Sequence, residues 1–63
     1  MIRINVEKLN AKQVNDIIIL VRDEGGQVFG SKKEKKLEID LGAKTLPERI
    51  KVLKEIIRIK KEN

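Results

Sequence analysis

The sequence predicts a single small α+β domain with the element order β-α-β-β-α, in which a three-stranded antiparallel sheet of strand order 1-3-2 carries two helices on one face. Three observations predict this fold class. Two segments alternate apolar and polar residues, as half-buried strands do. Two longer segments repeat apolar residues at helical spacing, and each of them begins with a capping motif. The chain of 63 residues has room for one domain, 1–63, with a marginal core.

The first half predicts a strand followed by a helix. Residues 2–6 alternate apolar and polar side chains, which is the pattern of a strand with one buried face. Asn10 is the expected N-cap, and Gln13 stands three residues later, where its side chain completes a capping box. Gly25 and Gly26 are expected to end the helix, because Gly adopts the left-handed conformation without a Cβ penalty.

The second half predicts two strands and a long helix. Residues 27–31 form a short strand candidate, and residues 36–41 alternate polar and apolar side chains more clearly than any other segment. Thr45 and Glu48 have the spacing of a second capping box, from which a helix is expected to run towards Lys61.

The connections between these elements predict the strand order. The second and third strands are joined by a short polar turn and form an antiparallel hairpin. The first strand, the helix and the second strand form a right-handed crossover. The third strand is therefore expected between the other two.

Composition excludes several classes of function. The chain has no Cys and no His, so it lacks thiolate ligands for zinc and the commonest general base. Thr45 and Ser31 have no His to activate them, so we expect no enzyme, no metal site and no cofactor. No apolar run is long enough to span a membrane, which favours a cytoplasmic protein. The Lys- and Glu-rich composition is typical of thermophiles.

The helices carry more aliphatic residues than one sheet face needs. On the last helix, Leu46, Ile50, Leu53 and Ile57 form one stripe, and a second stripe lies about a third of a turn away. Exposed aliphatic residues are common on monomeric proteins, but self-association as a homodimer would also bury the excess. The interface expected for a homodimer, or for another protein partner, comprises Ile19, Leu20, Val52, Ile56 and Ile59.

The net charge of +5 lies in the second half of the chain. Residues 1–26 are neutral overall, whereas residues 27–44 carry +2 and residues 45–63 carry +3. Four lysines in the hairpin turn and one side of the last helix could bind the phosphates of DNA or RNA. Lysines in a turn also protect a sheet edge from aggregation, and glutamates interleave the helical cations. The candidate contacts are Lys32, Lys33, Lys35 and Lys36, with Lys51, Lys54, Arg58 and Lys61 as secondary contacts.

The helix–hairpin–helix order is similar in outline to the double-stranded-RNA-binding module, which has three strands between its helices where this chain has two. Gly30-Ser31 beside the hairpin resembles small toxin ribonucleases of that architecture. Those enzymes use a His at the next position, where this chain has Lys32. The resemblance therefore implies no ribonuclease activity.

The sequence favours a non-enzymatic basic module that self-associates and binds nucleic-acid backbone with little sequence specificity. The alternative is a protein-interaction or assembly subunit that uses exposed aliphatic helix faces and binds no nucleic acid. The absence of Tyr, Trp and His argues against stacking on single-stranded bases.

Overall fold

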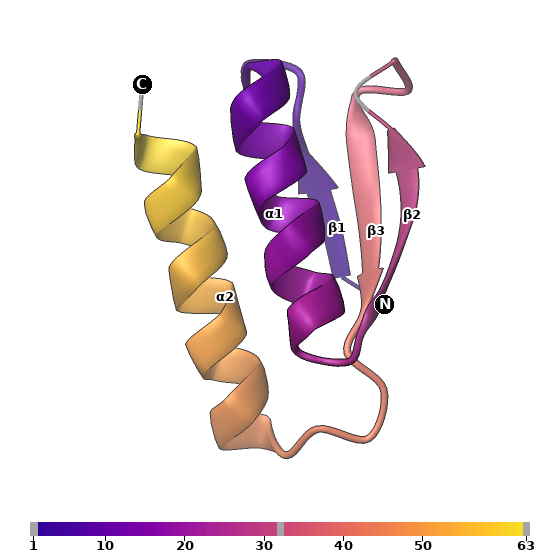
Figure 1. Ribbon diagram of the computed structural model, residues 1–63, viewed down its shortest axis with the longest axis vertical. Helices are drawn as coiled ribbons and strands as arrows, with labels where there is room; N and C mark the ends of the chain where they lie inside the picture. The colour runs from indigo at the N-terminus through magenta and orange to yellow at the C-terminus, as the bar shows by residue number, and fades with distance from the viewer. Residues whose placement is uncertain (1, 32, 63) are drawn as a thin grey trace.

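The computed structural model describes residues 2–31 and 33–62, which form the expected β-α-β-β-α sequence of elements (Figure 1). The strands are β1 (Ile2–Asn5), β2 (Gln27–Ser31) and β3 (Lys36–Asp40), and the helices are α1 (Ala11–Asp23) and α2 (Leu46–Lys61). The strands lie in the order β1-β3-β2, and both pairs are antiparallel. The predicted fold class and strand order are confirmed.

Helix α1 begins and ends where its local sequence predicts. The Asn10 side chain accepts a hydrogen bond from the Gln13 N–H at 2.8 Å, and the Gln13 side chain accepts one from the Asn10 N–H at 2.9 Å. After α1, Gly25 adopts a φ of 80°, which favours Gly. A Cβ on Gly26 would lie 2.7 Å from the carbonyl oxygen of Asp40. Gly26 therefore allows the turn after α1 to approach the end of β3 closely.

The core lies between one face of the sheet and the two helices. Leu37 and Ile39 of β3 and Ile17 of α1 are completely buried. Residues that alternate with the buried ones in the strands, such as Arg3 and Phe29, are exposed on the other face. The eleven buried apolar residues form one cluster: Ile4, Val6, Leu9, Val14, Ile17, Val21, Leu37, Ile39, Leu41, Val52 and Ile56.

Two polar side chains join α1 to α2, one at each end of the helix pair. Gln13, which is 5% exposed, donates from Nε2 to the Ile59 carbonyl oxygen at 3.0 Å and to the Glu62 carbonyl oxygen. At the other end, Lys44 Nζ lies 3.4 Å from a Glu24 carboxylate oxygen and 3.6 Å from one of Glu48. These contacts connect the first turn of α1 with the last turn of α2, and the end of α1 with the start of α2.

The rotation of α2 about its own axis differs from the sequence prediction. Val52 and Ile56, predicted as interface residues, are each 2% exposed in the core, and Ile59 packs against the core. The other apolar stripe points outward, with Leu46 69%, Ile50 43% and Ile57 51% exposed. Both stripes have helical spacing, so periodicity could not select between them. Packing against α1 and the contacts of Gln13 and Lys44 fix the rotation.

The two residues of α1 that were predicted at the interface differ in exposure. Leu20 is partly buried and packs against the core of the same chain, because it lies on the flank of α1 that is continuous with the core face. Ile19 is 48% exposed, so its side chain remains accessible to a partner.

Candidate nucleic-acid interface

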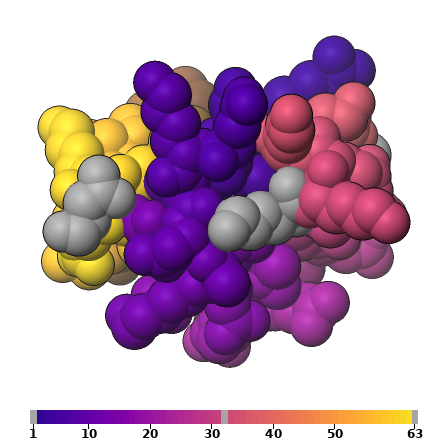
Figure 2. Space-filling view, turned by 90° about the horizontal axis from the view of Figure 1, so that it is seen from above, coloured from indigo at the N-terminus to yellow at the C-terminus, as the bar shows by residue number. Residues whose placement is uncertain are grey.

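Three segments that are distant in the sequence meet at one end of the molecule. β1 and β2 run towards this end, and α1 starts there after the loop of residues 6–10 (Figure 1). α2 runs antiparallel to α1 and finishes beside the start of α1. Viewed from above in Figure 2, the C-terminal turn of α2, the start of α1 and the hairpin loop lie side by side. We call this the basic end, and its lysines are Lys8, Lys12, Lys33, Lys35, Lys36, Lys60 and Lys61.

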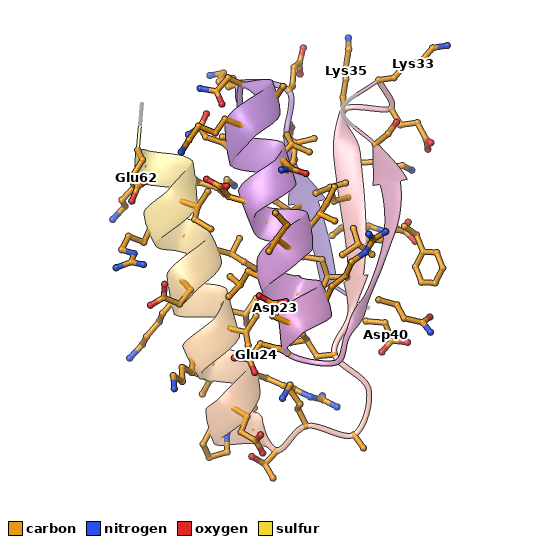
Figure 3. All side chains as sticks on the ribbon, in the orientation of Figure 1. Asp23, Glu24, Lys33, Lys35, Asp40 and Glu62 are labelled. Carbon is orange, nitrogen blue, oxygen red and sulfur yellow. The ribbon has the colours of Figure 1, made fainter. Side chains whose placement is uncertain are left out.

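The hairpin loop holds its lysines at the tip of the sheet. The Glu34 N–H donates to the Ser31 carbonyl oxygen at 3.1 Å, which closes the turn. Lys35 adopts a φ of 65°, an uncommon conformation for a residue with a Cβ. Its carbonyl oxygen accepts a hydrogen bond from the Val6 N–H at 3.0 Å, so the strained residue is held by the segment that follows β1. Lys33 and Lys35 both project from this end in Figure 3. Lys32, predicted as a contact, lies outside the described residues.

Most of the lysines at the basic end are not neutralised by a partner. Lys12 Nζ lies 3.3 Å from an Asp16 oxygen, and Lys35 Nζ lies 3.7 Å from a Glu7 oxygen. Such exposed pairs contribute about 0–1 kcal/mol and are readily exchanged for another anion. Within residues 2–31 and 33–62, five lysines of the basic end form no ion pair: Lys8, Lys33, Lys36, Lys60 and Lys61.

A hollow lies between the end of α2 and the loop that connects β1 to α1. It has a volume of about 410 Å³ and is lined by Asn5, Glu7, Lys8, Leu9 and Lys60. Lys8 and Lys60 come from opposite ends of the chain, and both line this hollow. Glu7 lowers the positive potential here, although its carboxylate also pairs with Lys35.

The opposite end of the molecule has a different charge balance from the basic end, where seven lysines accompany the carboxylates of Glu7, Glu34 and Glu62. The charged residues of the opposite end comprise three cations and four carboxylates: Arg22, Lys44, Arg49, Asp23, Glu24, Asp40 and Glu48. Asp23, Glu24 and Asp40 are labelled there in Figure 3. The Thr45 hydroxyl and N–H donate to Glu48, at 2.7 Å and 3.3 Å. These hydrogen bonds and the nearby Lys44 lower the pKa of Glu48, so its carboxylate is charged and engaged at neutral pH.

The predicted secondary contacts are only partly brought together. Lys61 lies at the basic end, but Lys51 precedes it by ten residues, which corresponds to about 15 Å along a helix. Lys54 lies between them, on the exposed side of α2. Arg58 donates to Glu55 in a close ion pair of 2.6 Å. Lys51 and Lys54 therefore do not belong to the basic end, whereas Arg58 lies at its margin, two residues before Lys60, and is paired with Glu55.

The candidate residues predicted from the sequence did not include three lysines of the basic end. They also did not include the exposed aromatic residue of β2. Lys8, Lys12 and Lys60 join the hairpin only through the topology, and the neutral charge of residues 1–26 concealed the first two. Phe29 is 46% exposed on the open face of the sheet, in register with Glu38, which pairs with Arg3 at 3.4 Å. Adjacent residues in a strand point to opposite faces of the sheet, so packing of Val28 on the core side would have predicted that Phe29 is exposed.

The described residues contain no group of three His, Cys, Asp or Glu side chains placed to hold a metal ion. None of the described helices combines the length and hydrophobicity needed to cross a membrane. Comparisons of the chain with family models, curated proteins and solved structures give no match.

Proposed function

We propose that this protein is a non-enzymatic module that binds nucleic-acid backbone at the basic end. The observation that carries the proposal is the convergence of lysines from the hairpin loop, the start of α1 and the end of α2. Five of them have no ionic partner among the described residues, so they can bind phosphates without breaking an existing ion pair. The opposite end offers no comparable set.

The dimensions of the molecule agree with a short binding site. Its two shorter axes measure 21 and 16 Å. Each strand of a duplex carries one phosphate per about 3.4 Å of the duplex axis, so an end of this width spans an axial length that holds about six phosphates of a strand. The seven lysines of the basic end can contact several of them at once.

The type of cation at the basic end predicts low sequence specificity. Base edges are read chiefly by Arg, Lys, Asn and Gln, but the seven lysines of the basic end lack the planar, pre-organised fork of donors that Arg offers. Lysine acts as a compact point charge that attracts any phosphate. We therefore propose DNA or RNA backbone in the cytoplasm as the ligand.

The test is a fluorescence anisotropy titration with labelled single-stranded and duplex DNA and RNA at several salt concentrations. Binding should weaken as salt rises, with a log–log slope of about −3 to −5 if four or five phosphates are neutralised. The double variant Lys8→Gln/Lys33→Gln should lower the affinity at least tenfold at about 0.1 M salt.

The double variant Lys51→Gln/Lys54→Gln is the matched control, because it removes the same charge from exposed positions outside the basic end. It should change the affinity less than threefold. Equal losses in the two double variants, or binding that does not respond to salt, would contradict the proposal.

A second candidate function, protein docking, is favoured by the exposure of Leu46, Ile50 and Ile57 on α2. Two of the five interface residues predicted from sequence, Val52 and Ile56, are buried in the core and cannot form such a surface. Self-association through a homodimer therefore stays a prediction that needs a different surface.

A further inference from the structure

The exposed apolar residues of α2 form a narrow seam along the helix. Leu46, Ile50, Leu53 and Ile57 are separated by four, three and four residues, which is the spacing of the a and d positions in a heptad repeat. At 100° per residue they fall within an arc of about 60°. Leu53 is partly buried, and the other three are 43–69% exposed. The seam spans about three turns of helix.

Cations flank this seam on both sides. Arg49 and Lys60 lie on the side towards the core, and Lys54 and Lys61 lie on the other side, each about 45–75° from the centre of the seam. All four residues are exposed and form no ion pair with another described residue, but the Arg49 guanidinium donates a hydrogen bond to the Gly42 carbonyl oxygen at 3.0 Å.

The carboxylates of α2 lie away from the seam. Glu48, Glu55 and Glu62 fall within about 40° of one another, nearly opposite the seam. Glu48 is engaged with Thr45 and Lys44, and Glu55 with Arg58. The charged residues of α2 that lie beside the seam, on its two rims, are therefore all cations.

This charge distribution favours an acidic partner helix at the seam over a second copy of α2. In paired helices, charges beside the apolar seam set the choice of partner, and like charges oppose pairing. A second copy of α2 would bring four more cations against the same rims and supply no carboxylate there. An amphipathic helix with Leu or Ile at the seam and Asp or Glu beside it would complement both the shape and the charge.

The width of the seam separates a protein helix from a membrane surface. A helix that lies in a membrane interface buries a broad apolar face in the lipid and commonly carries aromatic residues on that face. The seam of α2 is about 60° wide and contains no aromatic residue. This narrow geometry matches helix-to-helix packing.

We propose that the α2 seam is a docking site for an acidic amphipathic helix of a partner protein. This inference rests on the second candidate function and gives its partner a defined chemistry. The contact covers about three turns, which is the size of a small, transient interface. Lys60 and Lys61 belong both to the basic end and to the rims of the seam, so substitutions at Ile50 and Ile57 within the seam are compared with substitutions at Lys8 and Lys33 outside it.

The experiment is a titration of the full chain with a designed helical peptide of eighteen residues, with Leu at the a and d positions and Glu at the e and g positions. A peptide with Lys at the same e and g positions is the charge control. We expect binding of the Glu peptide in the range of tens to hundreds of micromolar, and at least tenfold weaker binding of the Lys peptide. Equal binding of the two peptides would overturn the proposal.

Variants of the protein locate the binding site. Ile50→Ser/Ile57→Ser should weaken binding of the Glu peptide at least tenfold, whereas Ile19→Ser, which alters an equally exposed Ile on α1, should change it less than twofold. Equal effects would overturn the proposal. Circular dichroism melts of the three proteins check that each is folded.

Two further measurements examine the competing occupants. Stronger binding to vesicles of 30% phosphatidylserine in phosphatidylcholine than to the Glu peptide would overturn the proposal in favour of a membrane. A dimer in sedimentation that Ile50→Ser/Ile57→Ser disperses would overturn it in favour of a second copy. The same variant should keep its nucleic-acid affinity within twofold. Loss of peptide binding and failure of the basic end are therefore separate results.

Discussion

Both ends of the molecule have a contact that joins α1 to α2, but the two contacts differ in chemistry. At the basic end, the neutral amide of Gln13 joins α1 to the last carbonyl groups of α2. At the opposite end, Lys44 joins the two helices through the carboxylates of Glu24 and Glu48. The ionic contact pairs the Lys44 ammonium group with carboxylates, whereas the amide contact involves no charged side chain. The neutral link at the basic end therefore leaves its lysines available for an external anion.

Removal of the amide link should have the largest effect on stability. Gln13→Ala deletes the donor to the Ile59 carbonyl oxygen and half of the capping box with Asn10. Loss of a cap and of a buried hydrogen bond should together lower the free energy of unfolding by about 2 kcal/mol. Urea unfolding measures this loss. Lys12→Ala is the control at the neighbouring exposed position, and an equally small effect of both variants would contradict the role of Gln13.

Removal of the ionic link should have a smaller effect that depends on salt. Lys44→Met keeps most of the aliphatic stem but loses both ion pairs. We expect a loss of about 0.5–1 kcal/mol at low salt, and a smaller loss at 1 M salt, because ions screen partly exposed pairs. The effect of Gln13→Ala should not respond to salt in this way. If both variants show the same salt dependence, the contrast between the two ends is wrong.

The smallest effect should be a response to acid at the opposite end. The hydrogen bonds from Thr45, helped by Lys44, hold the pKa of Glu48 below its ordinary value of 4.5. A carboxylate with a lowered pKa in the folded state stabilises the protein above its unfolded pKa, and this contribution disappears as the pH falls through the folded pKa. The stability difference between wild type and Glu48→Gln should therefore be present at pH 7 and shrink below about pH 4.5. Urea midpoints from pH 7 to pH 3 provide the measurement, and a constant difference across this range would exclude the carboxylate as the cause.

The fold was predictable because its signals are local. The alternation of residues 2–6 and 36–41, the capping boxes at Asn10 and Thr45, and the glycines after α1 act within a few residues of where they occur. They determine where each element begins and ends. The strand order then follows from general rules of chain connection.

The orientation of α2 was not predictable from local signals. Both of its stripes consist of aliphatic residues at helical spacing, and the choice between them depends on contacts such as that of Gln13 with Ile59, 46 residues apart. When a helix has two equivalent apolar stripes, the spacing of its apolar residues does not show which stripe faces the core. The residues that face solvent are consequently the stripe that the sequence assigned to the core.

The candidate site was predictable only where one segment supplied it. The hairpin lysines adjoin one another in the sequence, so their charge was visible there. Lys8 and Lys60 lie 52 positions apart and meet only because β1 and α2 both finish at the same end. Charge counted by segment cannot reveal a surface that the topology assembles from three segments.

Backbone amide shifts in an NMR titration with a short oligonucleotide test the central claim most directly, because they report which end binds. At low salt, the amides of Lys8, Lys33, Lys35 and Lys60 should shift together with one binding curve, while those of Asp23, Asp40 and Lys44 remain unchanged. The shifts should recede when salt is added. Shifts centred on the opposite end, or no shifts at low salt, would contradict binding at the basic end.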